Sequence, residues 1–261
     1  MSAEPISLST TDGVAQIVID RTHKRNAMST DMWRTLRNLV DQAAGDPAVL
    51  VIILRGADSS AFASGADIEE MLHIVGSEEA AWALMNTVRA TEHALSECAK
   101  PVIAMIRGIC IGGGVELALG CDLRFASRNA RFAVPPAKLG LVYSVASTRR
   151  LIQLVGLGRA RDLLYSARTL EAAEALEIGL VERMFDDDQV ELETLRYAGV
   201  LASRSQYSIR AAKRVSAAAV AGGSDDDDAI RRLRGSAFTG KDLEEGITAF
   251  MEKRSPRFTW R

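Results

Sequence analysis

The chain has 261 residues, of which 48% are hydrophobic and 25% are charged, and its formal net charge is −2. This is the composition of an ordinary globular protein, and the length fits one large domain or one domain with an appendage. The near balance of acidic and basic residues excludes a global field that would attract nucleic acid or an anionic membrane. An anionic ligand would have to be held by local groups.

The first half of the chain alternates strand-like and helix-like stretches. Apolar, β-branched runs predict buried strands at 14–20, 48–56 and 100–110, with shorter strands at 121–127 and 130–134. Between the first two strands, Ser29 is expected to cap a helix that Gly45 ends. A long helical pattern covers 77–98. This alternation predicts an α/β architecture.

The second half is mostly helical. Helices are predicted over 144–156, 158–166, 170–178, 188–204 and 205–220, with a short strand at 181–185. Four aspartates at 225–228 are expected to begin the next helix, where the positive end of the helix dipole favours them. The last helix is expected to run until Pro256 stops it.

The cysteines and the N-terminus indicate the compartment. Cys98, Cys110 and Cys121 form no CxxC pair, and two of them lie in apolar runs, which predicts small buried side chains and no disulfide framework. The N-terminal residues lack the basic and apolar stretches of a signal peptide. The longest clean apolar run, 48–54, is too short to span a membrane. We therefore expect a cytoplasmic protein.

The stretch GICIGGGVELALGCD, residues 108–122, places three glycines between a buried strand and a helix, shortly before Glu116. It is not a dinucleotide fingerprint, because Leu117 stands at the third glycine position, and Val115 replaces the lysine of a P-loop. Backbone amides at a helix start can bind an oxygen that carries negative charge. An oxyanion hole needs a second donor, and FASGADIEEM at 62–71 offers a similar loop before a helix.

These segments carry a resemblance to a known family. FASGADI at 62–68, together with KPVIAMIRGICIGGGVELALGCDLRFAS at 100–127, resembles the crotonase, or enoyl-CoA hydratase/isomerase, superfamily. RNAMS at 25–29, GLVERMF at 179–185 and EGITAFMEKRSPRF at 245–258 are similar too. The resemblance covers essentially the whole chain. It implies an α/β fold with a spiral core of β-β-α turns over 1–200 and a C-terminal helical region over 201–261 that builds homotrimers or hexamers.

The resemblance also implies a site for acyl-CoA, with no cofactor and no metal. The amides of Ala66 and Gly113 would hold the thioester oxygen as an enolate forms, and Glu116 would act as acid and base. Tyr143 could hydrogen-bond the substrate. Coenzyme A would be bound by Arg25, Ala27, Ala66, Asp67 and Ile68, and by Phe250 and Lys253 from a neighbouring subunit.

The sequence departs from the pattern of the family's hydratases at the second catalytic glutamate. Pro136 stands at that position and cannot carry a proton, and Tyr143 and Ser144 replace a glycine-rich turn. A double-bond isomerase could work with Glu116 alone. The stretch from Pro136 to Tyr143 resembles a malonyl-type decarboxylase branch, in which a histidine replaces Ala66. A binding protein without catalysis is the third alternative.

The remaining candidates predict no further chemistry. His23, His73 and His93 are scattered without metal-ligand spacing, so we expect surface or satisfied side chains. Arg149 and Arg150 could meet a phosphate, but a structural role is favoured.

Overall fold

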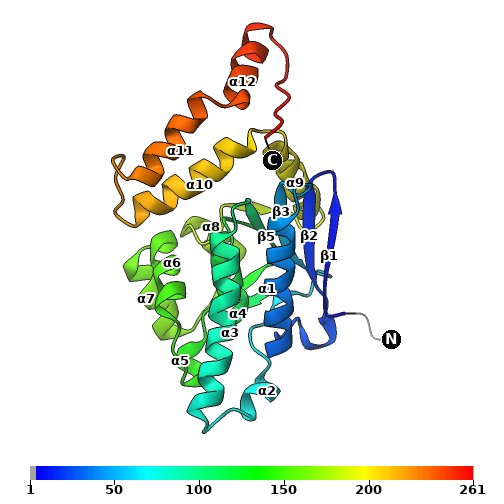
Figure 1. Cartoon of the computed structure of the whole chain (residues 1–261). Coiled ribbons are helices and arrows are strands. Elements are labelled where there is room, and N and C mark those ends of the chain that lie inside the picture. Colours follow the sequence, from blue (N-terminus) through cyan, green and yellow to red (C-terminus); the bar gives the residue numbers. More distant parts are fainter. Residues whose placement is uncertain (1–3, 261) are drawn as a thin grey trace.

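The computed structural model describes residues 4–260 (Figure 1). The predicted regions 1–200 and 201–261 include residues 1–3 and 261, which lie outside the described part, and this division of the chain stays a prediction. Six strands form the larger sheet, in the order β1 (Ile6–Thr11), β2 (Val14–Ile19), β3 (Val51–Gly56), β5 (Val102–Ile106), β7 (Leu123–Ser127) and β10 (Arg183–Phe185). Only the β1–β2 pair of this sheet is antiparallel among the described strands.

A second, smaller sheet consists of four short strands, in the order β4 (Ala61–Ala63), β6 (Ile109–Ile111), β8 (Arg131–Ala133) and β9 (Thr169–Glu171). β3 is followed by β4, β5 by β6, and β7 by β8, so each turn of the chain gives one strand to each sheet. The strands of successive turns pair in parallel within both sheets. Helices follow these strand pairs, which confirms the predicted spiral of β-β-α turns.

Helices lie around the two sheets, and the last helices of the chain project away from the sheets (Figure 1). They are α1 (Thr30–Gly45), α2 (Ile68–Leu72), α3 (Glu78–Glu97), α4 (Gly113–Gly120), α5 (Pro136–Leu139), α6 (Val145–Val155), α7 (Leu157–Ser166), α8 (Ala172–Glu177), α9 (Val190–Ala202), α10 (Gln206–Val220), α11 (Asp228–Phe238) and α12 (Lys241–Met251). A short 3-10 turn covers Thr22–Lys24. No helix of the described residues is long and apolar enough to cross a membrane.

The larger sheet is buried on both faces. Along β3, Ile52 and Leu54 belong to one apolar cluster, while Val51 and Ile53 belong to another on the opposite face. Helix α9 covers the second face, and α1, α3 and α4 lie over the first. Because both faces are covered, a strand here reads as a continuous apolar run, which is why the sequence predicted these strands.

Most predicted element boundaries agree with the structure, and several differ. The helix predicted over 170–178 begins as strand β9 and becomes helical only at Ala172, and of the aspartates at 225–228 only Asp228 lies in α11, with Asp227 as its cap. The Ser29 Oγ accepts a hydrogen bond from Met32 N at 3.3 Å and caps α1, as predicted. The predicted strand at 100–110 is divided at Gly108, where a positive φ turns the chain from one sheet into the other. The last helix ends at Met251, before Pro256, and Lys253 follows it in the left-handed region.

Gly114 allows the start of α4 to approach β4 closely. A Cβ at this position would overlap the carbonyl oxygen of Ala63. We expect Gly114→Ala to lower the free energy of unfolding by about 2–3 kcal/mol, as overpacking a core does. Gly199→Ala is the matched control, because Gly199 lies inside α9 with no atom within 4 Å of an added Cβ. Equal midpoints of the two variants in urea denaturation would contradict this prediction.

Candidate active site

Two loops meet at one edge of the smaller sheet. The loop at 64–67 follows β4, and Gly112 follows β6 and leads into α4. Because β4 and β6 are parallel neighbours, their carboxyl ends lie at the same edge. Gly65 has φ +101°, and a Cβ added there would lie 3.3 Å from Gly113 N. The two loops therefore approach each other closely through their backbones.

Among residues 4–260, several backbone amides at this junction donate no hydrogen bond, and those of Ala66 and Gly113 are among them, together with Gly65, Gly114 and Val115. Met28 N donates to Gly65 O at 2.7 Å, and Asp67 N donates to Met28 O at 3.0 Å, so this bridge uses the groups on either side of the Ala66 amide. Gly113 opens α4, where the first amides lack an intrahelical acceptor. The structure thus places two donors from different loops beside each other.

Glu116 lies in the first turn of α4, next to these amides. Burial raises its pKa to about 8, with a further increase from the negative charge of Glu92. The Ser147 hydroxyl and the Arg150 guanidinium lower it in part. A carboxyl group with this pKa can both take and give a proton near neutral pH.

Glu92 is the site residue that sequence reasoning missed. It lies on α3, is 2% exposed, and its Oε1 accepts a hydrogen bond from Ser147 Oγ at 2.8 Å. The pKa of Glu92 is raised by burial, although Ser147 and Arg150 act in the opposite direction. The available signal was a glutamate on the buried face of α3, beside Thr91 and three residues before Leu95, both of which are buried.

The comparisons with known proteins agree with this geometry. A family model for enoyl-CoA hydratase/isomerase matches residues 9–261. The chain belongs to the enoyl-CoA hydratase/isomerase family. The crotonyl-CoA hydratase of Syntrophomonas wolfei is 34% identical over 264 residues, which cover 99% of each chain.

Solved structures show the same crotonase fold. An enoyl-CoA hydratase/isomerase family protein from Hyphomonas neptunium has a TM-score of 0.96 at 40% identity, and the match covers 99% of this chain and 98% of that one. The enoyl-CoA hydratase from Bacillus anthracis has a TM-score of 0.89 at 32% identity, covering 98% and 99%. The family and fold inferred from the sequence motifs are thereby confirmed.

The segment after β8 holds Pro136 and Tyr143, at which the sequence was expected to depart from the pattern of the family's hydratases. Pro136 is buried at the start of α5. Tyr143 donates its hydroxyl hydrogen to Gly112 O at 2.7 Å, and this bond holds the glycine loop in place. Burial, then the charge of Glu116, raises the pKa of Tyr143 well above its ordinary value, and its hydroxyl stays protonated. A contact of Tyr143 with substrate stays a prediction.

Five of the seven residues predicted to bind coenzyme A lie together. They are Arg25, Ala27, Ala66, Asp67 and Ile68. Ser64 N donates to Arg25 O at 3.1 Å, which joins the first loop to the loop after β4. Arg21 Nη1 donates to the Asp67 carboxylate at 2.7 Å and to Ala27 O at 2.9 Å. These bonds hold the loop around Arg25 and the loop after β4 together, so that they form one surface near the amides of Ala66 and Gly113.

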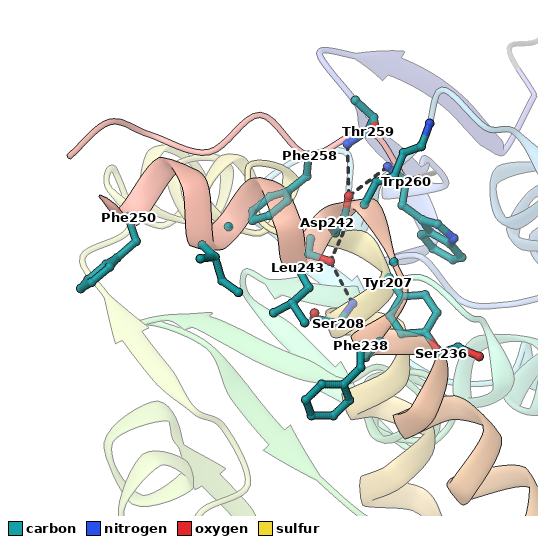
Figure 2. A pocket seen from close by; sticks show the side chains of 16 residues that line it. Tyr207, Ser208, Ser236, Phe238, Asp242, Leu243, Phe250, Phe258, Thr259 and Trp260 are labelled. Atoms are coloured by element: carbon teal, nitrogen blue, oxygen red, sulfur yellow. Dashed lines mark hydrogen bonds between the residues drawn. The ribbon is translucent and has the colours of Figure 1, made fainter. Parts of the chain in front are cut away.

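Phe250 and Lys253 do not join this surface within one chain. They lie on and just after α12, at the opposite end of the molecule from α2 (Figure 1). Phe250 lines a mostly apolar cavity of about 930 Å³ between α10, α12 and the C-terminal segment (Figure 2). Asp242, which also lines the cavity, accepts a 2.6 Å hydrogen bond from Ser205 Oγ. This cavity is separate from the Glu116 site.

The other predicted residues are accounted for. All three cysteines are buried and free, as their apolar surroundings predicted. His23, His73 and His93 are exposed, which confirms the surface assignment. Arg150 faces Glu92, with Nη1 3.6 Å from Oε2, and Arg150 Nη2 donates to Ser96 Oγ at 3.0 Å.

The pKa of Glu116 predicts a pH-dependent stability difference. Its folded-state pKa of about 8 exceeds the ordinary value of 4.5, so the stability that this group contributes is fully present below about pH 4.5 and is lost as pH rises through about 8. Glu116→Gln cannot ionise and should not lose it. In calorimetry, the Tm of Glu116→Gln is expected to exceed that of the wild type at pH 9, with a smaller difference at pH 5.

Glu97→Gln is the control for this measurement, because Glu97 is exposed on α3. It should show the wild-type dependence of Tm on pH. A Glu116→Gln variant whose Tm follows the wild type in parallel from pH 5 to pH 9 would show that Glu116 titrates normally.

Proposed function

We propose that this protein binds a coenzyme A thioester and moves a proton at the carbon next to the thioester carbonyl. The observation that carries the proposal is the pair of unpartnered amides, Ala66 N and Gly113 N, beside the protonatable Glu116. Amides in this arrangement stabilise an oxygen on which negative charge develops. A carboxyl group with a raised pKa supplies the acid and base.

In this proposal the thioester oxygen accepts hydrogen bonds from the two amides. The Glu116 carboxylate removes a proton from the carbon next to the carbonyl, and the C–H electron pair forms the enolate, whose oxygen carries the charge. Glu116 then returns the proton to the carbon two positions further along a 3-enoyl chain. The double bond moves into conjugation, and one carboxyl group suffices for both transfers.

Hydration of a 2-enoyl thioester is the second candidate, and the hydratase names of the relatives favour it. It needs a base for water and an acid for carbon, and Pro136 supplies neither. Decarboxylation of a malonyl-type thioester has less support, because the Tyr143 hydroxyl hydrogen is already donated to Gly112. A binding protein without catalysis would not require the raised pKa of Glu116.

The surface around Arg25 is proposed to hold the coenzyme A moiety. Arg21 and Lys24 are paired with Asp67, at 2.7 and 3.7 Å. Arg25 is exposed and makes no ion pair within residues 4–260, so its guanidinium is available to a phosphate. Ile68 is 53% exposed beside it and offers an apolar surface for the adenine.

We expect an acyl-CoA panel to name the reaction. Crotonyl-, 3-enoyl-, malonyl- and methylmalonyl-CoA would be incubated with the protein and followed by mass spectrometry and ultraviolet absorbance. Isomerisation leaves the mass unchanged and creates conjugation, hydration adds water, and decarboxylation loses carbon dioxide. Gly113→Pro removes one amide donor and should lower kcat/KM by about 10²–10³-fold.

Gly113→Ala is the matched control, since it keeps the N–H. Its Cβ would lie 3.0 Å from the Trp33 ring, so it reproduces the Cβ contact that proline would also make. Equal activities of the two variants would refute the oxyanion assignment. Tight binding of all four thioesters without turnover would make the protein a carrier or sensor.

We also propose that α10–α12 join copies of this chain into a trimer or hexamer, and that Phe250 and Lys253 then reach a neighbour's coenzyme A. Phe238 and Phe250 are 81% and 82% exposed, and Met251 is 75% exposed. Apolar surface of this kind marks an interaction site. The Figure 2 cavity is open beside it.

Light scattering is expected to give three or six times the mass of one chain. Phe238→Asp with Phe250→Asp should reduce this mass to that of the monomer, because charges would be buried without partners. A wild-type protein that is monomeric at micromolar concentration would overturn the assembly while leaving the Glu116 chemistry open.

A further inference from the structure

Pro136 stands where a second catalytic glutamate was expected, but the protein contains another buried carboxyl group elsewhere in the fold. Glu92 projects from α3 and is almost fully enclosed. Its Oε1 accepts the Ser147 hydroxyl hydrogen, but its Oε2 is buried without a hydrogen-bond partner among the described residues. Arg150 Nη1 is likewise buried without one, 3.6 Å from that oxygen.

Ser147 links this carboxyl group to the proposed catalytic centre. It lies in the first turn of α6, and its Oγ is 2.8 Å from the Oγ of Ser144, the cap of that helix. The Ser147 hydroxyl hydrogen-bonds Glu92, and it lowers the pKa of both Glu92 and Glu116. α3 and α6 both pack against α4, which brings the two carboxyl groups together.

We propose that Glu92 is a positioning residue that acts on Glu116 across the Ser147 hydroxyl and sets whether Glu116 holds a proton. This role rests on the proposed function, in which Glu116 moves the proton. The family's hydratases place their second carboxyl group after β8, whereas here it comes from α3 and stays out of contact with substrate.

The charge balance of the site explains how Glu92 acts. Arg150 from α6 acts on both carboxyl groups, Tyr143 before α6 faces both, and Cys110 from β6 faces Tyr143. Only Arg150 among them is positive, so two ionised carboxylates would leave an uncompensated buried charge. Ser147 and Arg150 favour the ionised form of Glu92. They act on Glu116 in the same direction, but the negative charge of Glu92 raises the pKa of Glu116. That charge therefore favours a proton on Glu116, which makes Glu116 a stronger base once the proton has left.

The test reads the proton on Glu116 directly in the free protein. Protein labelled with ¹³C at the glutamate carboxyl carbons is titrated by NMR, and the Glu116 signal is identified by its absence in Glu116→Gln. In Glu92→Gln, the midpoint of Glu116 should fall by about one pH unit, the lower end of what a charged neighbour produces. Glu97→Gln, on the same helix but exposed, should leave the midpoint unchanged.

Arg150→Gln is expected to shift the titration midpoint of Glu116 in the opposite direction. It also provides a test if Glu92→Gln does not fold. Removing the positive charge that faces both carboxyl groups should raise the midpoint of Glu116. An unchanged midpoint in Glu92→Gln, or in Arg150→Gln where Glu92→Gln does not fold, would overturn the inference. A purely structural role of Glu92 would lower the Tm without moving the titration.

The titration needs no substrate, so it is independent of the acyl-CoA panel. A shifted midpoint with no turnover of any thioester would retain the coupling and reject the proposed function. An unshifted midpoint in an active enzyme would reject the coupling alone.

Discussion

The site depends on the close backbone approach of two loops at the edge of the smaller sheet. Parallel pairing of β4 with β6 places the residues after both strands side by side. Gly65 and Gly114 leave no side chain at the contact, where a Cβ would meet the opposite backbone. Because the amides of Ala66 and Gly113 lie at this contact with no partner among the described residues, they remain available as donors.

Burial decides the electrostatics next to these donors. A carboxyl group at the start of a helix is stabilised in its charged form by the dipole, whereas burial favours the neutral form. In α4, burial dominates, and Glu92 adds a second negative charge close by. The single guanidinium of Arg150 faces both carboxyl groups. An active site with a raised carboxyl pKa follows from this packing of α3, α4 and α6.

The chain shares its fold with the enoyl-CoA hydratase/isomerase family, and the segment after β8 is where its sequence was expected to differ from the family's hydratases. Pro136 supplies no carboxyl group in this segment, and the Tyr143 hydroxyl donates a hydrogen bond to Gly112 O. Ser147 in α6 hydrogen-bonds the glutamate of α3 and lowers the pKa of the glutamate of α4. The side chains that replace a glycine-rich turn thus become part of the proposed proton-holding network.

The sequence by itself determined the fold class, the family and the two glycine-containing loops. Apolar runs covered on both faces and short-range motifs such as 62–68 and 108–122 are local signals, so they are legible without coordinates. The end of the last helix was misplaced, because the left-handed turn at Lys253 stops α12 before Pro256 does. Lys253 carries no strong local signal for that conformation.

Only the tertiary structure decided which side chains surround Glu116. Glu92 and Ser147 are 55 residues apart, and nothing in their separation along the chain indicates a hydrogen bond. The sequence also left open whether the pKa of Glu116 is raised or lowered, because burial is a property of the assembled core and not of α4 alone. Local motifs therefore located the amide donors, whereas packing between helices that are distant in sequence determined the pKa of Glu116 beside them.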